Sequence, residues 1–114
     1  MDPATAAHRS LEGLALGDAF GERWFPLFRP PRQAYAEIRA RRTPPEPFWH
    51  WTDDTAMALG ILRVLDRHGE IRRTELARAF AHGHRADAAR GYGRGMHALL
   101  PRLLQEPDRW PESA

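Results

Sequence analysis

The segment Thr52-Asp53-Asp54-Thr55 concentrates the residue types best suited to chemistry in this sequence. Two adjacent carboxylates flanked by hydroxyl groups offer several oxygen donors close together, and hard divalent cations such as Mg²⁺ and Mn²⁺ prefer oxygen ligands. The same residue types are also favoured at the start of a helix, where they cap free backbone N–H groups and complement the helix dipole. The two interpretations are compatible, because one carboxylate can cap the helix while the other binds an ion.

Residues 13–21 (GLALGDAFG) form a second unusual segment. Gly13, Gly17 and Gly21 are spaced four residues apart, which would allow another helix or a ligand to approach closely. Asp18 adds a carboxylate to an otherwise apolar helix. It is either exposed near the helix end, or buried and in need of a polar partner.

Histidines and tryptophans give weaker signals. His82 and His84 lie two residues apart, so on a helix they face different ways, whereas zinc-binding helices use i and i+4 spacing. His50 could contact a substrate, although a surface position is the ordinary alternative. Trp49 and Trp51 flank His50 in an extended stretch, so we expect one ring to face inward and the other to face the site.

Helices must position these residues. Apolar residues recur at helical spacing in several stretches, and no stretch alternates with period two, so the sequence predicts an all-α fold. Gly69 supplies a stop for one helix, and Pro101 should kink or restart another. Residues 105–114 hold two prolines and are expected to be an irregular tail. The expected helices are residues 4–19, 34–41, 53–68, 74–81 and 96–104.

Length and composition restrict the class of protein. The chain has 114 residues, the size of a single domain. It contains no cysteine, so neither a disulfide framework nor a thiolate metal site is available. No apolar stretch reaches the length of a membrane span, and the N-terminus lacks the order of a signal peptide. We therefore expect a cytoplasmic protein without a membrane partner.

The basic charge is uneven and comes from arginine alone. Residues 63–102 hold nine arginines and four acids, although the whole chain is only +2. Residues 70–80 resemble the first helix of a helix-turn-helix DNA-binding domain. However, residues 82–95 hold four glycines and show no apolar periodicity for a recognition helix, so we expect no nucleic-acid partner.

Three segments together resemble the N-terminal part of ADP-ribosylglycohydrolases, enzymes related to the dinitrogenase-reductase-activating glycohydrolase. They are residues 13–21 (GLALGDAFG), 51–57 (WTDDTAM) and 90–93 (RGYG). The resemblance implies an all-α orthogonal multi-helix bundle with a centre of two Mg²⁺ or Mn²⁺ ions. It also implies hydrolysis of the glycosidic bond of ADP-ribose, carried by a protein side chain or by a small molecule.

The resemblance assigns a role to each matching residue. The two ions would hold the ribose hydroxyls and polarise an attacking water, and a carboxylate near the site would transfer a proton. The implied metal ligands are Thr52, Asp53 and Asp54, of which Asp53 and Asp54 are also the catalytic candidates. Asp18 and Thr55 would contact these ligands without binding the ions themselves. Gly91, Tyr92 and Gly93 would contact the substrate.

The sequence also departs from the family pattern. The family's second ligand motif, Asp-x-Asp-Thr/Ser, and its glycine-asparagine-glycine loop have no counterpart here. We therefore expect residues 1–114 to be a single incomplete domain that supplies the N-terminal half of the site and is inactive alone. Many members carry a glutamate a few residues after Gly-Asp-Ala-x-Gly, whereas here Glu22 follows Gly21 directly and Phe25 stands where that acid often falls. Glu22 is accordingly not assigned a catalytic role, and a catalytically inactive helical relative that serves as a binding or structural module is the alternative.

Overall fold

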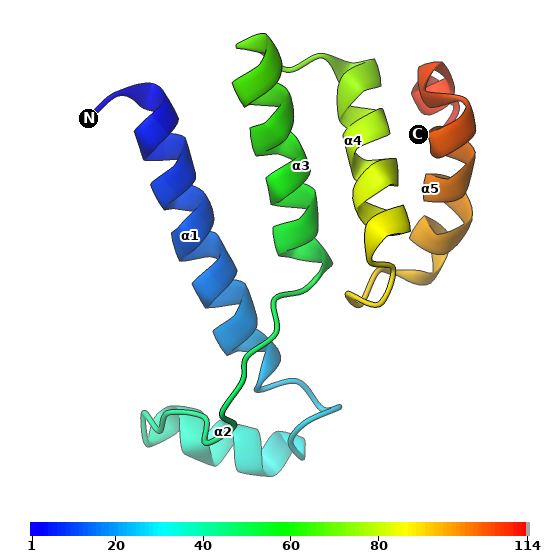
Figure 1. The fold of residues 1–114 in the computed structure, drawn as a ribbon. Coiled ribbons are helices and arrows are strands. Elements are labelled where there is room, and N and C mark those ends of the chain that lie inside the picture. Colours follow the sequence, from blue (N-terminus) through cyan, green and yellow to red (C-terminus); the bar gives the residue numbers. More distant parts are fainter. Residues whose placement is uncertain (114) are drawn as a thin grey trace.

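The computed structural model describes residues 1–113, and every regular element in that range is helical. Four helices stand side by side in the order α1, α3, α4, α5, while α2 lies across one end (Figure 1). The all-α prediction is confirmed. The elements are α1 (Pro3–Glu22), α2 (Pro31–Arg39), α3 (Asp53–His68), α4 (Arg73–Ala86), α5 (Arg94–Gln105) and the 3-10 helix η1 (Pro107–Ser113).

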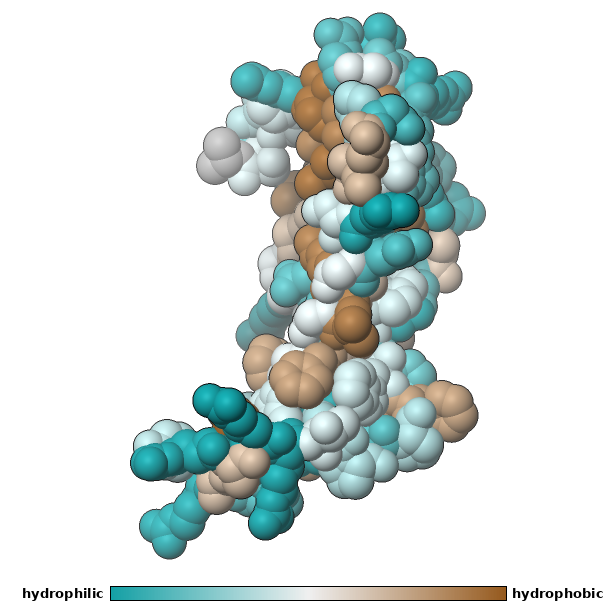
Figure 2. Space-filling view, turned by 90° about the vertical axis from the view of Figure 1, so that its left-hand side faces the viewer, coloured by the Kyte–Doolittle hydropathy of each residue, from teal (hydrophilic) through white to brown (hydrophobic). Residues whose placement is uncertain are grey.

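Helix α1 is capped at its start and exposes much of its length. The Asp2 carboxylate accepts the Thr5 backbone N–H at 3.0 Å, which satisfies one of the free donors of the first turn. The helix packs against α3, and Ala19 is its one buried residue. Figure 2 shows apolar side chains running along this face of the molecule, and the exposed Leu14 and Leu16 belong to α1.

The glycines of α1 do not create the close helix contact that their spacing suggested. A Cβ atom at Gly13, Gly17 or Gly21 would meet nothing within 4 Å among the described atoms. The close approach occurs instead at Gly60 of α3, where a Cβ would lie 3.0 Å from the Phe80 ring of α4. The absence of a side chain at Gly60 thus allows the close contact between α3 and α4.

Helices α3 and α4 define the middle of the layer. Helix α3 has the bounds expected from the sequence, and Gly69 ends it with a φ of 72°, in the left-handed region. Helix α4 runs from Arg73 to Ala86 and is therefore longer than predicted. The short turn of a helix-turn-helix motif is thus absent where it was considered, because α4 continues through residues 82–86.

The core lies between α4 and α5. It joins the buried residues Ala77 and Ala81 of α4 to Leu100 and Leu103 of α5, with Tyr92 from the connecting segment. Helix α5 continues through Pro101 without a restart.

The expectation of an irregular tail is wrong for residues 107–113. This segment forms η1, which packs against both α4 and α5. Pro107 is buried, and Trp110 is half-buried against the core. Apolar contact thus orders a segment whose prolines suggested irregular structure.

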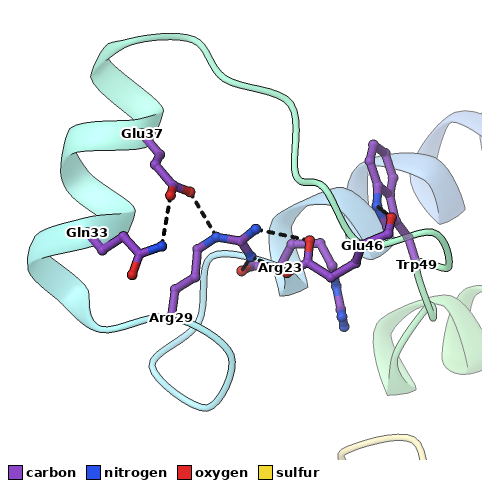
Figure 3. Close-up of polar contacts among 6 residues, drawn as sticks. All are labelled: Arg23, Arg29, Gln33, Glu37, Glu46 and Trp49. Carbon is purple, nitrogen blue, oxygen red and sulfur yellow. Dashed lines mark hydrogen bonds and ion pairs between the residues drawn. The ribbon is translucent and has the colours of Figure 1, made fainter.

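Helix α2 is attached differently from the others. It makes no packing contact with any other helix in the described part of the chain. Instead, the Arg29 side chain, 4% exposed, donates to Glu37 of α2 at 2.9 Å, to Glu46 at 3.0 Å, and to the Arg23 carbonyl (Figure 3). A buried arginine and two carboxylates therefore fix α2.

Within residues 1–113, no helix combines the length and the apolar character needed to cross a membrane.

Candidate functional site

The end of α1 meets the start of α3 through the carboxylate of Asp18. Its Oδ2 accepts the backbone N–H of Thr52 at 2.7 Å and that of Thr55 at 3.3 Å. The two threonine hydroxyls donate to the same carboxylate, at 2.8 Å from Thr52 and 2.6 Å from Thr55. Asp18 is therefore a partly buried and fully bonded cap for α3, supplied from another helix.

The protonation of Asp18 follows from these contacts. Burial raises the pKa of this carboxyl, but the hydrogen bonds from Thr55 and Thr52 outweigh it, so the pKa of Asp18 lies below its ordinary value of 3.8. Hydrogen bonds to the charged form favour ionisation. Asp18 is thus an anion at neutral pH, and its hydrogen-bonding capacity is taken up by α3.

Arg90 holds the other side of the same backbone. Its carbonyl accepts the Asp53 N–H at 2.7 Å, and its Nη1 donates to the Trp51 carbonyl at 3.0 Å. Its guanidinium lies 3.5 Å from the centre of the Trp51 ring, and its Nε donates to Asp87 at 2.8 Å. The peptide units on both sides of Thr52 are consequently fixed by residues distant in sequence.

Asp53 and Asp54 line a cavity of about 340 Å³, here called the carboxylate cavity. Asp53 is half-buried and Asp54 is exposed. Throughout residues 1–113, neither carboxylate accepts a side-chain or backbone hydrogen bond or forms an ion pair. The other residues lining the cavity are Gly17, Asp18, Gly21, Glu22, Phe25, Thr52 and Gly91.

The oxygen atoms of this cavity could supply part of the coordination shell of one hard cation. Asp53 and Asp54 offer free carboxylate oxygens. The Thr52 hydroxyl donates to Asp18 and accepts the Asp54 N–H at 3.2 Å, which leaves one lone pair for an ion. The described residues bring no group of three His, Cys, Asp or Glu side chains together as metal ligands. Mg²⁺ can nevertheless be held by one or two carboxylates and water.

Glu22 is the functional candidate that the sequence pattern passed over. It lies on the wall of the carboxylate cavity together with Phe25, and its carboxylate has no hydrogen-bond partner in the described chain. Burial raises the pKa of Glu22, and the negative charges of Asp18, Asp53 and Asp54 raise it further, against the lowering effect of Arg23. Glu22 is identified by its closeness in space to Asp18, Asp53 and Asp54. A single sequence motif does not reveal this cluster of acids.

A second cavity of about 490 Å³ adjoins the first, and we call it the arginine cavity. The two share Glu22, Thr52 and Gly91. The arginine cavity is further lined by Arg23, Leu27, Phe28, His50, Trp51, Asp87, Ala89 and Arg90.

The two tryptophans beside His50 face different surroundings, as expected. Trp51 lines the arginine cavity. Trp49 instead donates its Nε1–H to the Glu46 carbonyl at 3.0 Å and packs edge-on against Phe20, with ring centres 5.6 Å apart. His50 also lines this cavity and is exposed, so its position fits both the surface alternative and a substrate contact.

The segment Gly91-Tyr92-Gly93 is split between site and core. Gly91, with a φ of 85°, lines both cavities. Tyr92 is 6% exposed, and its ring packs edge-on against His84. Neither Tyr92 nor Gly93 lines either cavity, so of this predicted substrate-binding segment the structure places Gly91 alone at the site.

Comparison with known proteins gives one match. A family model described as ADP-ribosylglycohydrolase matches residues 2–114. No curated protein and no solved structure shows significant similarity to the chain.

Proposed function

The chain belongs to the ADP-ribosylglycohydrolase family, and on this premise we propose that it hydrolyses the glycosidic bond of ADP-ribose attached to a protein side chain or another acceptor. The family is generally metal-dependent. We assign the binding of Mg²⁺ or Mn²⁺ to Asp53 and Asp54, with the Thr52 hydroxyl as an additional oxygen donor.

One observation carries this proposal: two neighbouring carboxylates face a cavity without any partner in the described chain. A carboxylate that only caps a helix bonds to the free N–H groups there, but Asp18 and the Thr52 hydroxyl already accept the N–H groups of Thr52, Asp54 and Thr55. The side chains of Asp53 and Asp54 are consequently left for a ligand from outside.

The residues around Asp53 and Asp54 would have different roles in the reaction. A bound ion would hold the ribose hydroxyls and polarise the attacking water. Asp18 keeps the backbone of Thr52 and Thr55 in place. Glu22, unbonded on the shared wall of the two cavities, is the carboxyl group available for proton transfer to or from the leaving group.

Metal binding is the direct test. We expect Mn²⁺ titrated into the protein, followed by electron paramagnetic resonance of free Mn²⁺, to show weak binding, because two carboxylates fill only part of a coordination shell. Asp53→Asn or Asp54→Asn should weaken this binding by about tenfold or more, because each replaces an anionic ligand by a neutral amide and removes one of the two charges that attract the ion.

Asp108→Asn is the matched control. Asp108 is exposed in η1, far from the site in sequence, and its replacement should leave Mn²⁺ affinity unchanged. Circular dichroism should show equal helicity in all variants. Equal Mn²⁺ affinity in wild type, Asp53→Asn and Asp54→Asn would refute the assignment.

Hydrolysis separates the enzyme from its non-catalytic alternative. Released ADP-ribose should be measured by chromatography after incubation with an ADP-ribosylated protein, with Mn²⁺ and with EDTA. Release that EDTA abolishes supports the glycohydrolase. Mn²⁺ binding without any release would instead favour a helical relative that binds but does not hydrolyse.

A further inference from the structure

Arg23 is a buried cation that forms no ion pair with any described residue. It follows α1 directly and is 5% exposed. Its Nε is fully buried and lacks a hydrogen-bond partner, and its guanidinium forms no ion pair within the described residues. Its guanidinium lies over the face of Phe28, at 4.1 Å from the ring centre.

Arg29 shows what an equally buried arginine normally requires. It is 4% exposed and satisfied by Glu37, Glu46 and a carbonyl group. In Figure 3 the guanidinium of Arg23 lies outside this network of dashed contacts. A buried charge costs free energy unless it is paired and hydrogen-bonded. Unlike Arg29, Arg23 has no carboxylate in ion-pair contact within residues 1–113, and it acts on Glu22 and Glu46 only through its charge.

The free guanidinium belongs to the wall of the arginine cavity. The second arginine there, Arg90, is already engaged by Asp87, the Trp51 carbonyl and the Trp51 ring. That ion pair also offsets the charge of Asp87. Arg23 is therefore the arginine of this cavity that remains available to a ligand, and the neighbouring Glu22 on the shared wall is an acid without a hydrogen-bond partner in the described chain.

We infer that Arg23 binds a phosphate group of the substrate in the arginine cavity, while the carboxylate cavity receives the ribose. The inference rests on the proposed function for the identity of the ribose site. The forked N–H donors of a guanidinium match the oxygen spacing of phosphate, and their hydrogen bonds are charge-assisted. The cavity would thereby select phosphate-bearing ribosides over simple ribosides.

Inorganic pyrophosphate without divalent ions is a suitable probe, because it tests the anion site separately from the metal site. Isothermal titration in EDTA should show binding to the wild type that Arg23→Gln weakens by about tenfold, the loss expected for removing hydrogen bonds to a charged group. Arg63→Gln is the control, since Arg63 is exposed on α3 and lines neither cavity. Its affinity should equal that of the wild type.

Two further measurements protect the test from misfolding of the variant. Arg23→Lys keeps the charge but not the forked donors, so it should fold and still bind pyrophosphate more weakly. In the wild type, the Nε–H resonance of Arg23, identified by its loss in Arg23→Lys, should shift on addition of pyrophosphate. Unchanged affinity in both Arg23 variants, or equal weakening in Arg63→Gln, would overturn the assignment.

The outcome is distinguishable from failure of the proposed function. Asp53→Asn should bind pyrophosphate at least as well as the wild type, because it loses a negative charge next to the arginine cavity. Arg23-dependent pyrophosphate binding without Mn²⁺ binding or hydrolysis would leave an anion site in a protein of different activity. Mn²⁺-dependent hydrolysis that is unchanged in the Arg23 variants would support the glycohydrolase activity and refute the phosphate contact of Arg23.

Discussion

At the scale of single residues, Asp18 has the clearest consequence for stability. Its carboxylate accepts hydrogen bonds from the backbone and the hydroxyl of both Thr52 and Thr55. Asp18→Asn removes the negative charge and replaces one of the two acceptor oxygens by an N–H donor, so the contacts of Oδ1 and Oδ2 with Thr52 and Thr55 cannot all be kept. We expect a loss of about 2 kcal/mol in the free energy of unfolding, measured by urea denaturation.

The effect of Asp18 should depend on pH in a defined direction. Because the pKa of Asp18 is lowered in the folded protein, its stabilising effect is complete above its ordinary value of 3.8 and is lost as pH falls through the folded pKa. The difference between wild type and Asp18→Asn should therefore shrink below about pH 4. Asp66→Asn is the control, since Asp66 forms an exposed pair with His8, and such pairs contribute about 0–1 kcal/mol. A difference that stays constant down to the lowest pH at which the protein folds would contradict this account.

At the scale of elements, replacing two helical glycines by alanine should change the stability of the protein in opposite directions. Gly60→Ala would place a Cβ 3.0 Å and 3.3 Å from two atoms of the Phe80 ring. The gain in helix propensity is about 1 kcal/mol, while overpacking costs about 1–3 kcal/mol. We expect Gly60→Ala to be destabilising in a urea titration.

Gly13→Ala provides the comparison for this contact. Nothing lies within 4 Å of a Cβ at Gly13, so the propensity gain should appear alone, as a stabilisation of up to about 1 kcal/mol. In a Phe80→Leu background, Gly60→Ala should become less costly, because the two sites are in contact. Stabilisation by both glycine substitutions would show that the Phe80 ring moves aside freely.

The same elements show what the sequence could and could not predict. The bounds of α3 were predictable because Thr52, the acids after it and Gly69 are local start and stop signals. The partner of Asp18 was not, since its contacts span 34 and 37 residues and no local pattern encodes them. Glu22 was considered but not assigned, because Phe25 stands where the family's acid often falls, and Arg23 gave no signal in the sequence. The neighbours of both residues are set by how α1 meets the segment before α3.

At the scale of the whole molecule, the helices form a thin layer rather than a closed bundle. The extents are 47 × 39 × 23 Å, and several large apolar side chains on α1 and in the segment after it remain exposed, among them Leu16, Phe25 and Leu27.

The family match confirmed the family and the helical class. The expectation that residues 1–114 supply half of a two-metal site stays a prediction, because within residues 1–113 the two free carboxylates are joined by no third His, Cys, Asp or Glu side chain.

The attachment of α2 gives a prediction for the molecule as a whole. Since α2 packs on no other described helix, Arg29 and its partners Glu37 and Glu46 are its main link to the layer. Arg29→Gln should leave these carboxylates without their cation and release residues 31–47. Amide hydrogen exchange there should accelerate by about tenfold or more, while exchange in the α4–α5 core stays unchanged, because local and global opening are separate processes.

Arg39→Gln is the matched control for this release. Arg39 lies in the same helix but is exposed and donates to Tyr35 within α2, so its loss removes one charge without touching the Arg29 contacts. Exchange in residues 31–47 should then remain close to that of the wild type. If Arg29→Gln instead accelerated exchange in α4 and α5 to the same degree, α2 and the helical layer would unfold as one unit. The Arg29 cluster would then stabilise the entire described chain, since loss of a contact confined to α2 cannot speed opening of a core that unfolds independently.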